Sequence, residues 1–196
     1  KWNLPDGAEL YVYDDARSEV NGAYTSVNNA PNGQLQIEPI LGDTINVEYV
    51  VPPTVTHDRL LQIGQVIHDY RHIRKILTGG PLGGSPCLRD IVCPEGANYQ
   101  DVKRATVRTL ASGALCSGAI LTDTTHSGTP YLYTANHCGS MTNAVFTFQY
   151  ENTSCGGGGA SGSKTLSGSQ HLLSNANNDS AFFRLNQTIL STYQPY

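Results

Sequence analysis

The chain has 196 residues, of which 39% are hydrophobic and only 14% are charged, and its formal net charge is −4. Low charge combined with 20 glycines and 11 tyrosines is typical of an all-β extracellular protein rather than a helical cytosolic one. Neither the first nor the second part of the chain carries a basic run, which argues against nucleic-acid binding. No apolar stretch approaches the roughly 20 residues of a membrane span.

The chain begins at Lys1 without a charged-then-apolar signal segment, and this start has two interpretations. It fits a mature N-terminus after removal of a signal peptide, or a start inside a domain. Because Trp2 and Leu4 run straight into strand-like sequence, we favour the second interpretation.

Residues 1–78 are predicted to form a β-sandwich pro-domain or accessory domain that lacks earlier strands. Apolar residues alternate with period two in short runs separated by turn signals such as Asn32-Gly33 and Gly42-Asp43. Such runs, spaced by roughly 8–12 residues, indicate a sandwich. The expected strands lie around residues 10–13, 35–37, 45–51 and 61–70.

A linker is predicted to follow, because residues 73–86 contain four glycines and two prolines and cannot build a regular element. We place its core at residues 79–86. The basic residues Arg74 and Lys75 make the segment a candidate site of proteolytic cleavage.

Residues 87–196 are again predicted to be all-β. The Gly- and Ser-rich stretch 156–169 is expected to be an exposed loop. The predicted strands are Ala105 to Thr109, Ser117 to Leu121, Tyr131 to Thr134, Val145 to Tyr150 and Ala181 to Leu185.

All five cysteines lie in this second part, and no CxxC pair occurs, which argues against a zinc ribbon. Disulfides formed in an oxidising compartment fit better. An odd number of cysteines in a secreted protein leaves one thiol without a partner, and we interpret this as a sign of missing sequence. The cysteines are Cys87, Cys93, Cys116, Cys138 and Cys155.

The segment around His137 contains the residue pattern that indicates catalysis. Cys116-Ser-Gly-Ala-Ile-Leu is followed by Tyr131-Leu-Tyr-Thr-Ala-Asn-His137-Cys138, in which an apolar strand ends at a histidine beside a cysteine. This pattern resembles the region around the catalytic histidine of trypsin-like proteases. The resemblance implies that His137 is the general base and that a Cys116–Cys138 disulfide anchors its backbone. A loop of that length contributes on the order of 3 kcal/mol in the chain-entropy account.

The resemblance extends to the lysyl endopeptidase family of bacterial proteases. Cys87-Leu-Arg-Asp-Ile-Val-Cys93-Pro-Glu-Gly is similar to the start of the mature enzymes, and Phe148-Gln-Tyr-Glu-Asn-Thr-Ser-Cys155 is similar to a segment downstream of the histidine. It implies that residues 87–196 form the first six-stranded antiparallel barrel of a trypsin-like fold with its N-terminal extension. It also implies a Cys93–Cys155 disulfide and leaves Cys87 unpaired in this chain.

The triad carboxylate is predicted to be Asp179. Asn177-Asn-Asp179-Ser-Ala-Phe-Phe-Arg-Leu resembles the family's aspartate followed by an apolar strand. An aspartate that accepts a hydrogen bond from histidine Nδ1 fixes the tautomer and stabilises the imidazolium. Read by itself, an aspartate after two asparagines is an ordinary turn residue.

No Gly-x-Ser-Gly segment follows Asp179, so we expect the nucleophilic serine, with the oxyanion hole and substrate pocket, to lie in a missing second barrel. Ser161 and Ser163 precede Asp179 in the Gly-rich stretch and are rejected as nucleophiles. The chain is therefore predicted to be an inactive fragment of a serine endopeptidase, with apolar surface exposed where the second barrel would pack.

The alternative is a secreted, non-enzymatic binding or adhesion protein with a degenerate protease-like domain. The intact His137 and Asp179 argue against it, and the missing serine would decide between the two.

Other candidates are weaker. His68 and His72 are four residues apart, but the segment is strand-like and offers no third ligand, so no metal site and no cofactor are predicted. Three Asn-x-Ser/Thr segments, at Asn152, Asn178 and Asn186, are interpreted as chance matches in a bacterial protein. The expected partners are polypeptide substrates, and the N-terminal domain is expected to be able to pack on the protease domain. The expected location is extracellular.

Overall fold

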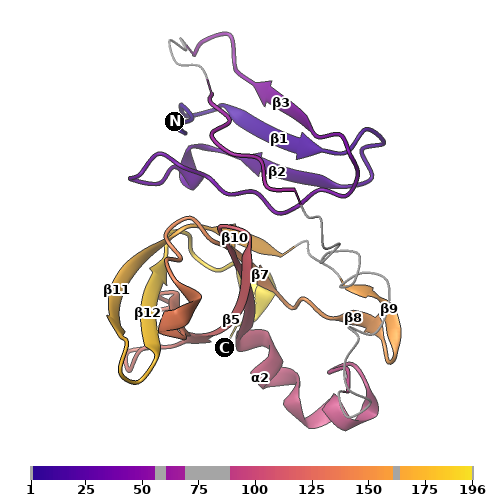
Figure 1. Cartoon of the computed structure of the whole chain (residues 1–196), viewed down its shortest axis with the longest axis vertical. Coiled ribbons are helices and arrows are strands. Elements are labelled where there is room, and N and C mark those ends of the chain that lie inside the picture. Colours follow the sequence, from indigo (N-terminus) through magenta and orange to yellow (C-terminus); the bar gives the residue numbers. More distant parts are fainter. Residues whose placement is uncertain (1, 56–60, 69–88, 161–163, 196) are drawn as a thin grey trace. The chain divides into compact units, whose positions relative to one another are not determined.

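A computed structural model of the chain describes residues 2–55, 61–68, 89–160 and 164–195. They divide into two compact units, residues 1–67 and 68–196. Strands dominate both units, and the one α-helix among the described residues is α2, Gln100–Ala105. The predicted all-β class is therefore confirmed (Figure 1).

The first unit contains an antiparallel sheet of order β2-β1-β3, with β1 at Glu9–Tyr13, β2 at Val20–Tyr24 and β3 at Asn46–Val50. Alternation along β1 places Leu10 and Val12 on one face, where both are 3% exposed. They pack with Leu4, Ala8 and Tyr24 in a small apolar core. A short 3-10 helix, η1 at Ser26–Asn28, follows β2.

The residues that pack against this core from outside the sheet do not form a second ladder of strands. Leu35, Ile37 and Leu61 pack against the core, yet residues 34–40 and 61–68 are not strands. A side chain of β2 holds one of these segments, since Asn21 Nδ2 donates to the Glu38 carbonyl oxygen at 2.9 Å. The apolar period predicts neither the backbone pairing nor, at Ile63 and Val66, the burial, since these side chains are 71% and 73% exposed. The strands expected at 35–37 and 61–68 were therefore wrong. Residues 69 and 70 lie outside the described part.

The second unit is built on a seven-stranded sheet of order β10-β7-β4-β5-β6-β12-β11. Every neighbouring pair is antiparallel. The strands are β4 Thr106–Ala111, β5 Ala114–Leu121, β6 Tyr131–Thr134, β7 Val145–Phe148, β10 Thr165–Ser167, β11 Ser169–Asn175 and β12 Ser180–Leu185.

This sheet closes on itself because its two edge strands are one continuous stretch of chain. Only Gly168 separates β10, which pairs with β7 at one edge, from β11, which pairs with β12 at the other edge. If β10 and β11 are counted as one bent strand, the barrel has six strands, as the family resemblance implies. Gly168 has φ +77, and its N–H donates to the Ala144 carbonyl oxygen at 2.9 Å. Closure removes the free edges that an open sheet would present.

The barrel interior is filled by the inward-facing residues of these strands. Phe146, Phe148, Phe183, Leu132 and Val107 are at most 2% exposed. They form one apolar cluster that also receives Ile189 and Tyr193 from the segment after β12, which includes the 3-10 helix η4, Ser191–Tyr193. The cluster holds the ends of β6 and β12 in place.

Two sequence expectations in this unit were wrong. Ala105, expected in a strand, ends α2, which follows the 3-10 helix η2 at Pro94–Tyr99. The Gly- and Ser-rich stretch 156–169 is not one loop, since it contains β9 at Gly157–Ala160, which pairs with β8 at Asn152–Ser154, and also β10. Composition predicted an exposed loop there, but Leu166 and Ser167 are buried because β10 pairs with β7.

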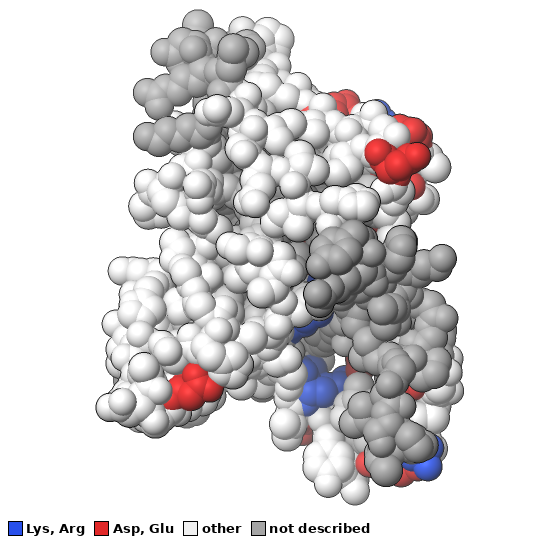
Figure 2. Space-filling view, in the orientation of Figure 1, with Lys and Arg blue, Asp and Glu red and all other residues white. Residues whose placement is uncertain are grey.

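Only 14% of the residues are charged. Figure 2 shows one face of the molecule on which, among the described residues, Lys, Arg, Asp and Glu form no extended patch of one sign. No helix in the described ranges is long and apolar enough to span a bilayer.

The closure at Gly168 can be tested by adding a methyl group. An alanine Cβ there would lie 2.7 Å from Asn186 Nδ2 and 3.3 Å from the Thr142 carbonyl oxygen. Gly128 is a matched control, because it has a similar φ of +75 but nothing within 4 Å of an added Cβ. Left-handed backbone alone costs a residue with a Cβ about 1–2 kcal/mol.

We therefore expect G168A to lower the free energy of unfolding in urea by about 1 kcal/mol more than G128A, because only the first change also strains packing. Equal losses for the two variants would show that Gly168 is not a tight point of closure.

Candidate active site

The site forms where β6 ends and β12 begins. β6 leads into a 3-10 helix, η3 at Asn136–Cys138, which carries His137, and Asp179 immediately precedes β12. The two strands are neighbours in the sheet, with Thr134 opposite Ala181. Their register continues past the strand ends, where the Asn136 N–H donates to the Asp179 carbonyl oxygen at 3.1 Å. Residues 42 positions apart are thereby brought side by side.

Both oxygens of the Asp179 carboxylate are engaged by His137. Oδ2 lies 2.5 Å from His137 Nδ1, and Oδ1 accepts from the His137 backbone N–H at 2.8 Å. A carboxylate at Nδ1 favours the tautomer with its proton on Nδ1, which leaves the lone pair on Nε2. This arrangement can accept a proton at Nε2 and stabilise the resulting imidazolium.

The same contacts lower the pKa of the Asp179 carboxyl below its ordinary value. The hydrogen bond from the His137 ring is the largest cause, followed by the hydrogen bond from the His137 backbone N–H. Both stabilise the charged form of the carboxylate. Asp179 therefore stays ionised at lower pH than an ordinary aspartate.

The turn before β12 aims this carboxylate. Asp179 has φ +51, in the left-handed region that aspartate and asparagine tolerate better than most residues. The Asn177 N–H donates to Asn175 Oδ1 at 2.9 Å, and Ser180 Oγ donates to Asn178 Oδ1 at 2.6 Å. Short polar side chains thus shape the turn, which is why the Asn-Asn-Asp sequence fits both a turn and a site.

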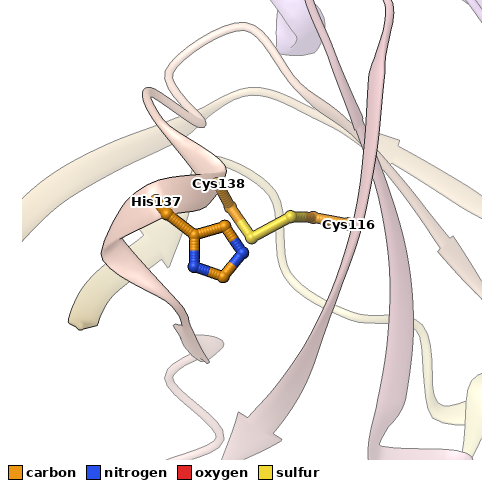
Figure 3. A group of neighbouring side chains, drawn as sticks. All are labelled: Cys116, His137 and Cys138. Atoms are coloured by element: carbon orange, nitrogen blue, oxygen red, sulfur yellow. A yellow bond between two sulfur atoms is a disulfide. The ribbon is translucent and has the colours of Figure 1, made fainter.

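A disulfide anchors η3 to the neighbouring strand. Cys116 on β5 is bonded to Cys138, and their Cα atoms are 6.0 Å apart. Figure 3 shows the His137 imidazole lying beside the two sulfur atoms. The cross-link fixes the residue next to His137, so it limits how far the imidazole can move from Asp179.

The second disulfide lies at the start of this unit. Cys93 is bonded to Cys155, with Cα atoms 4.6 Å apart. Asp90 reinforces the junction by accepting from Asn152 Nδ2 at 3.0 Å and from the Gly156 N–H at 2.8 Å. Both disulfides have the pairing implied by the family resemblance. Cys87 lies outside the described residues.

The remaining candidates do not join the site in the described part of the chain. Ser161, Ser163 and His72 lie outside the described residues. His68 is exposed in a segment that is not a strand.

The His137–Asp179 pair is open to solvent. The His137 side chain is 71% exposed and that of Asp179 is 49% exposed. An incoming group can therefore reach the pair. Water is not excluded from it, however, and exclusion of water is what strengthens electrostatic interactions in an active site.

An apolar patch on the outer barrel wall begins at the same strand ends, and sequence reasoning did not identify its residues. Tyr133 is opposite Phe182 on β12, which in turn is opposite Leu173 on β11. Tyr133 is 47% exposed and Leu173 57% exposed, while Tyr131 stacks on Phe182 with ring centroids 5.4 Å apart. The available signal was the loss of period two in Tyr131-Leu-Tyr and Ala181-Phe-Phe, which is typical of strands covered on both faces.

The second unit of the chain matches a known protein family. Residues 83–196 match the family model described as lysyl endopeptidase, C-terminal domain. The matched range contains the whole barrel, both disulfides and the His137–Asp179 pair.

The electrostatic coupling in the pair can be measured directly. We expect the Asp179 carboxyl to titrate below an ordinary aspartate in a ¹³C NMR titration, and H137A to move its pKa upward. The shift should be partial, because the alanine keeps the backbone N–H that donates to Oδ1. A depressed pKa stabilises the folded state above the ordinary pKa, and this contribution is lost as the pH falls through the folded value.

Asp123 is the internal control. Hydrogen bonds from the Ser127 side chain and backbone, with those from Thr125, lower its pKa to about 2 without any contribution from His137. An Asp179 pKa that H137A leaves unchanged, or an equal shift at Asp123, would contradict the assigned coupling.

Proposed function

Because the chain belongs to the lysyl endopeptidase C-terminal domain family, we propose that it supplies the general base and the carboxylate of a serine-type endopeptidase. The observation that carries the proposal is the hydrogen bond from His137 to Asp179, at 2.5 Å, in an exposed site at the end of the barrel. An ordinary surface ion pair would not need both carboxylate oxygens on one histidine.

The proposed mechanism follows from the two ring nitrogens. Asp179 holds Nδ1–H, so His137 Nε2 accepts the proton of an attacking serine hydroxyl. His137 then delivers this proton to the amine that leaves the cleaved peptide bond. Asp179 stabilises the imidazolium between these two steps without itself becoming protonated. No cofactor takes part in this proposal.

We place the nucleophilic serine downstream of Tyr196. Residues 180–196 contain no Gly-x-Ser-Gly segment, and Ser161 and Ser163 precede Asp179 in the chain. The oxyanion hole and substrate pocket are placed in the same downstream part. The family's preference for lysine is therefore not assigned to this chain.

The apolar patch supports a second body at the site. Tyr133 lies four residues before His137 on one strand, and Phe182 lies three residues after Asp179 on the next. Any polypeptide that brings a serine to His137 must pass close to these strand ends. We propose that the serine-bearing part covers the patch and thereby excludes water from the pair.

The remaining assignments concern the setting of the enzyme. Two disulfides and the family point to an extracellular protein that acts on polypeptides. We propose that residues 1–78 are a pro-domain or accessory domain and that residues 79–86 link it to the protease domain, residues 87–196.

The first functional test compares residues 1–196 with a longer protein that carries the downstream coding sequence, using a fluorophosphonate probe for activated serines. We expect labelling only of the longer protein, at a serine beyond Tyr196. Residues 1–196 should show no peptidase turnover, since nucleophile and oxyanion hole act as a unit with the base.

Variants of the longer protein assign the roles. H137A should lower peptidase turnover by several powers of ten, and D179N by about 10⁴-fold because the histidine tautomer is no longer held. D123N is the matched control, as Asp123 is a half-buried, hydrogen-bonded aspartate with no histidine in its carboxylate contacts.

Turnover by residues 1–196 that depends on His137 would contradict the downstream serine. A longer protein that binds polypeptides but takes no probe would support the non-enzymatic alternative.

A further prediction concerns the apolar patch. Replacing Tyr133 and Leu173 by threonine keeps strand propensity while removing apolar surface. We expect Y133T/L173T to reduce the self-association of residues 1–196 and the binding of a dye that fluoresces on exposed apolar surface. In the longer protein the same pair should lower the free energy of unfolding by about 1–3 kcal/mol, because covered side chains are lost.

Leu190 provides the control, since it is 55% exposed and lies outside the barrel strands. L190T should change neither quantity appreciably. If Y133T/L173T behaves like L190T in the longer protein, the serine-bearing part does not cover this patch.

A further inference from the structure

The two cysteines of the disulfide beside His137 lie close enough to its ring to bind a metal ion with it after reduction. Cys116 Sγ, Cys138 Sγ and a ring nitrogen of His137 all lie within 4.8 Å of one another. We propose that, once the Cys116–Cys138 bond is reduced, these three groups form a Cys₂His site for Zn²⁺ or a similar thiophilic divalent cation. In the oxidised protein the sulfurs are bonded to each other and offer no thiolate, so the site exists only after reduction.

The geometry requires small movements only. Tetrahedral zinc with Zn–S bonds of about 2.3 Å holds two sulfurs about 3.8 Å apart and places an imidazole nitrogen about 3.5 Å from each. Two sulfurs released from a bond of about 2 Å must therefore separate by less than about 2 Å. The distance between the His137 ring nitrogen and each sulfur is at most 4.8 Å, and it must shorten by about 1 Å. Rotation of the two cysteine side chains supplies the first change. Rotation of the His137 side chain, which is 71% exposed, supplies the second.

The surroundings of His137 also suit a metal ligand. Asp179 accepts from Nδ1, which leaves Nε2 as the nitrogen available to the ion. A carboxylate on the far nitrogen of a ligating histidine is the usual partner in zinc sites, where it fixes the ring and raises ligand basicity. Figure 3 shows the imidazole beside the sulfurs, on the short helix η3 next to β5. A water molecule would complete the fourth position at this exposed site.

The chemistry balances with a dithiol as reductant. The dithiol attacks the Cys116–Cys138 bond through a mixed disulfide, is oxidised to a cyclic disulfide, and leaves two thiols on the protein. Binding of the cation then releases the two thiol protons to the buffer. If the proposed function holds, the bound ion occupies Nε2, so metal binding and general-base action exclude each other.

The test titrates Co²⁺ into C87S protein, residues 1–196, under anaerobic conditions before and after dithiol reduction. The Cys87→Ser background removes the cysteine that lies outside the described residues. We expect one Co²⁺ per chain after reduction, with a sulfur-to-cobalt charge-transfer band and the visible bands of a tetrahedral ion. The oxidised protein should give neither.

Variants identify the ligands. C138S should abolish the charge-transfer band, whereas C93S should retain it, since Cys93 belongs to the other disulfide. H137A should remove a nitrogen ligand and weaken binding by at least about 10-fold, and D179N should weaken it by about 10–100-fold.

The proposal is overturned if the reduced protein gives no charge-transfer band, if the oxidised protein binds Co²⁺ equally, or if H137A binds as tightly as its parent. Loss of the strand signal in circular dichroism on reduction would also overturn it, since the site needs the folded barrel. None of these results depends on a serine, so failure of the metal site and failure of the proposed peptidase are distinguishable.

Discussion

The backbone pairing of β6 with β12 is the constraint on which the site depends. It sets Thr134 opposite Ala181, so the next residues beyond each strand, in η3 and in the turn before β12, meet at one end of the barrel. A one-residue slip would turn the inward-facing Leu132 and Phe183 outward and would also separate His137 from Asp179. Because Leu132 and Phe183 are at most 2% exposed, the apolar core that stabilises the barrel also fixes the geometry of the pair.

Two further features reduce the freedom of that end of the barrel. The Cys116–Cys138 disulfide ties η3 to β5, and the closure at Gly168 joins the two edges of the sheet into one stretch of chain. The site itself remains open, with the imidazole largely exposed and an apolar patch beginning at the same strands. A rigid but uncovered pair is what a barrel would present if a second body were to bring the nucleophile and exclude water. The same openness makes Nε2 accessible to a metal ion once the disulfide is reduced.

Much of this architecture could be predicted from sequence because the informative signals were local. β6 was predicted at its observed bounds, and β12 within one residue, because short apolar runs end there in polar turn residues. The disulfide pairings came from the family resemblance and not from the residues alone. Pairing in the first unit could not be predicted from period two, which is why Leu35 and Ile37 were assigned to a strand although they only cover a core. Composition also failed at residues 165–167, where pairing with β7 overrides the loop-like sequence. The apolar patch depends on registers between β6, β12 and β11, which no single segment reveals.

The proposed role of His137 as a base requires Asp179 to hold the ring proton on Nδ1 and to leave Nε2 unprotonated. The most direct measurement is a ¹⁵N NMR spectrum that correlates the His137 ring nitrogens with their carbon-bound protons, recorded on the oxidised protein at a pH where the imidazole is neutral. We expect a protonated Nδ1 and an unprotonated Nε2, with the Nδ1 signal changed by D179N but not by D123N. A neutral His137 with its proton on Nε2, unaffected by D179N, would contradict the proposed role.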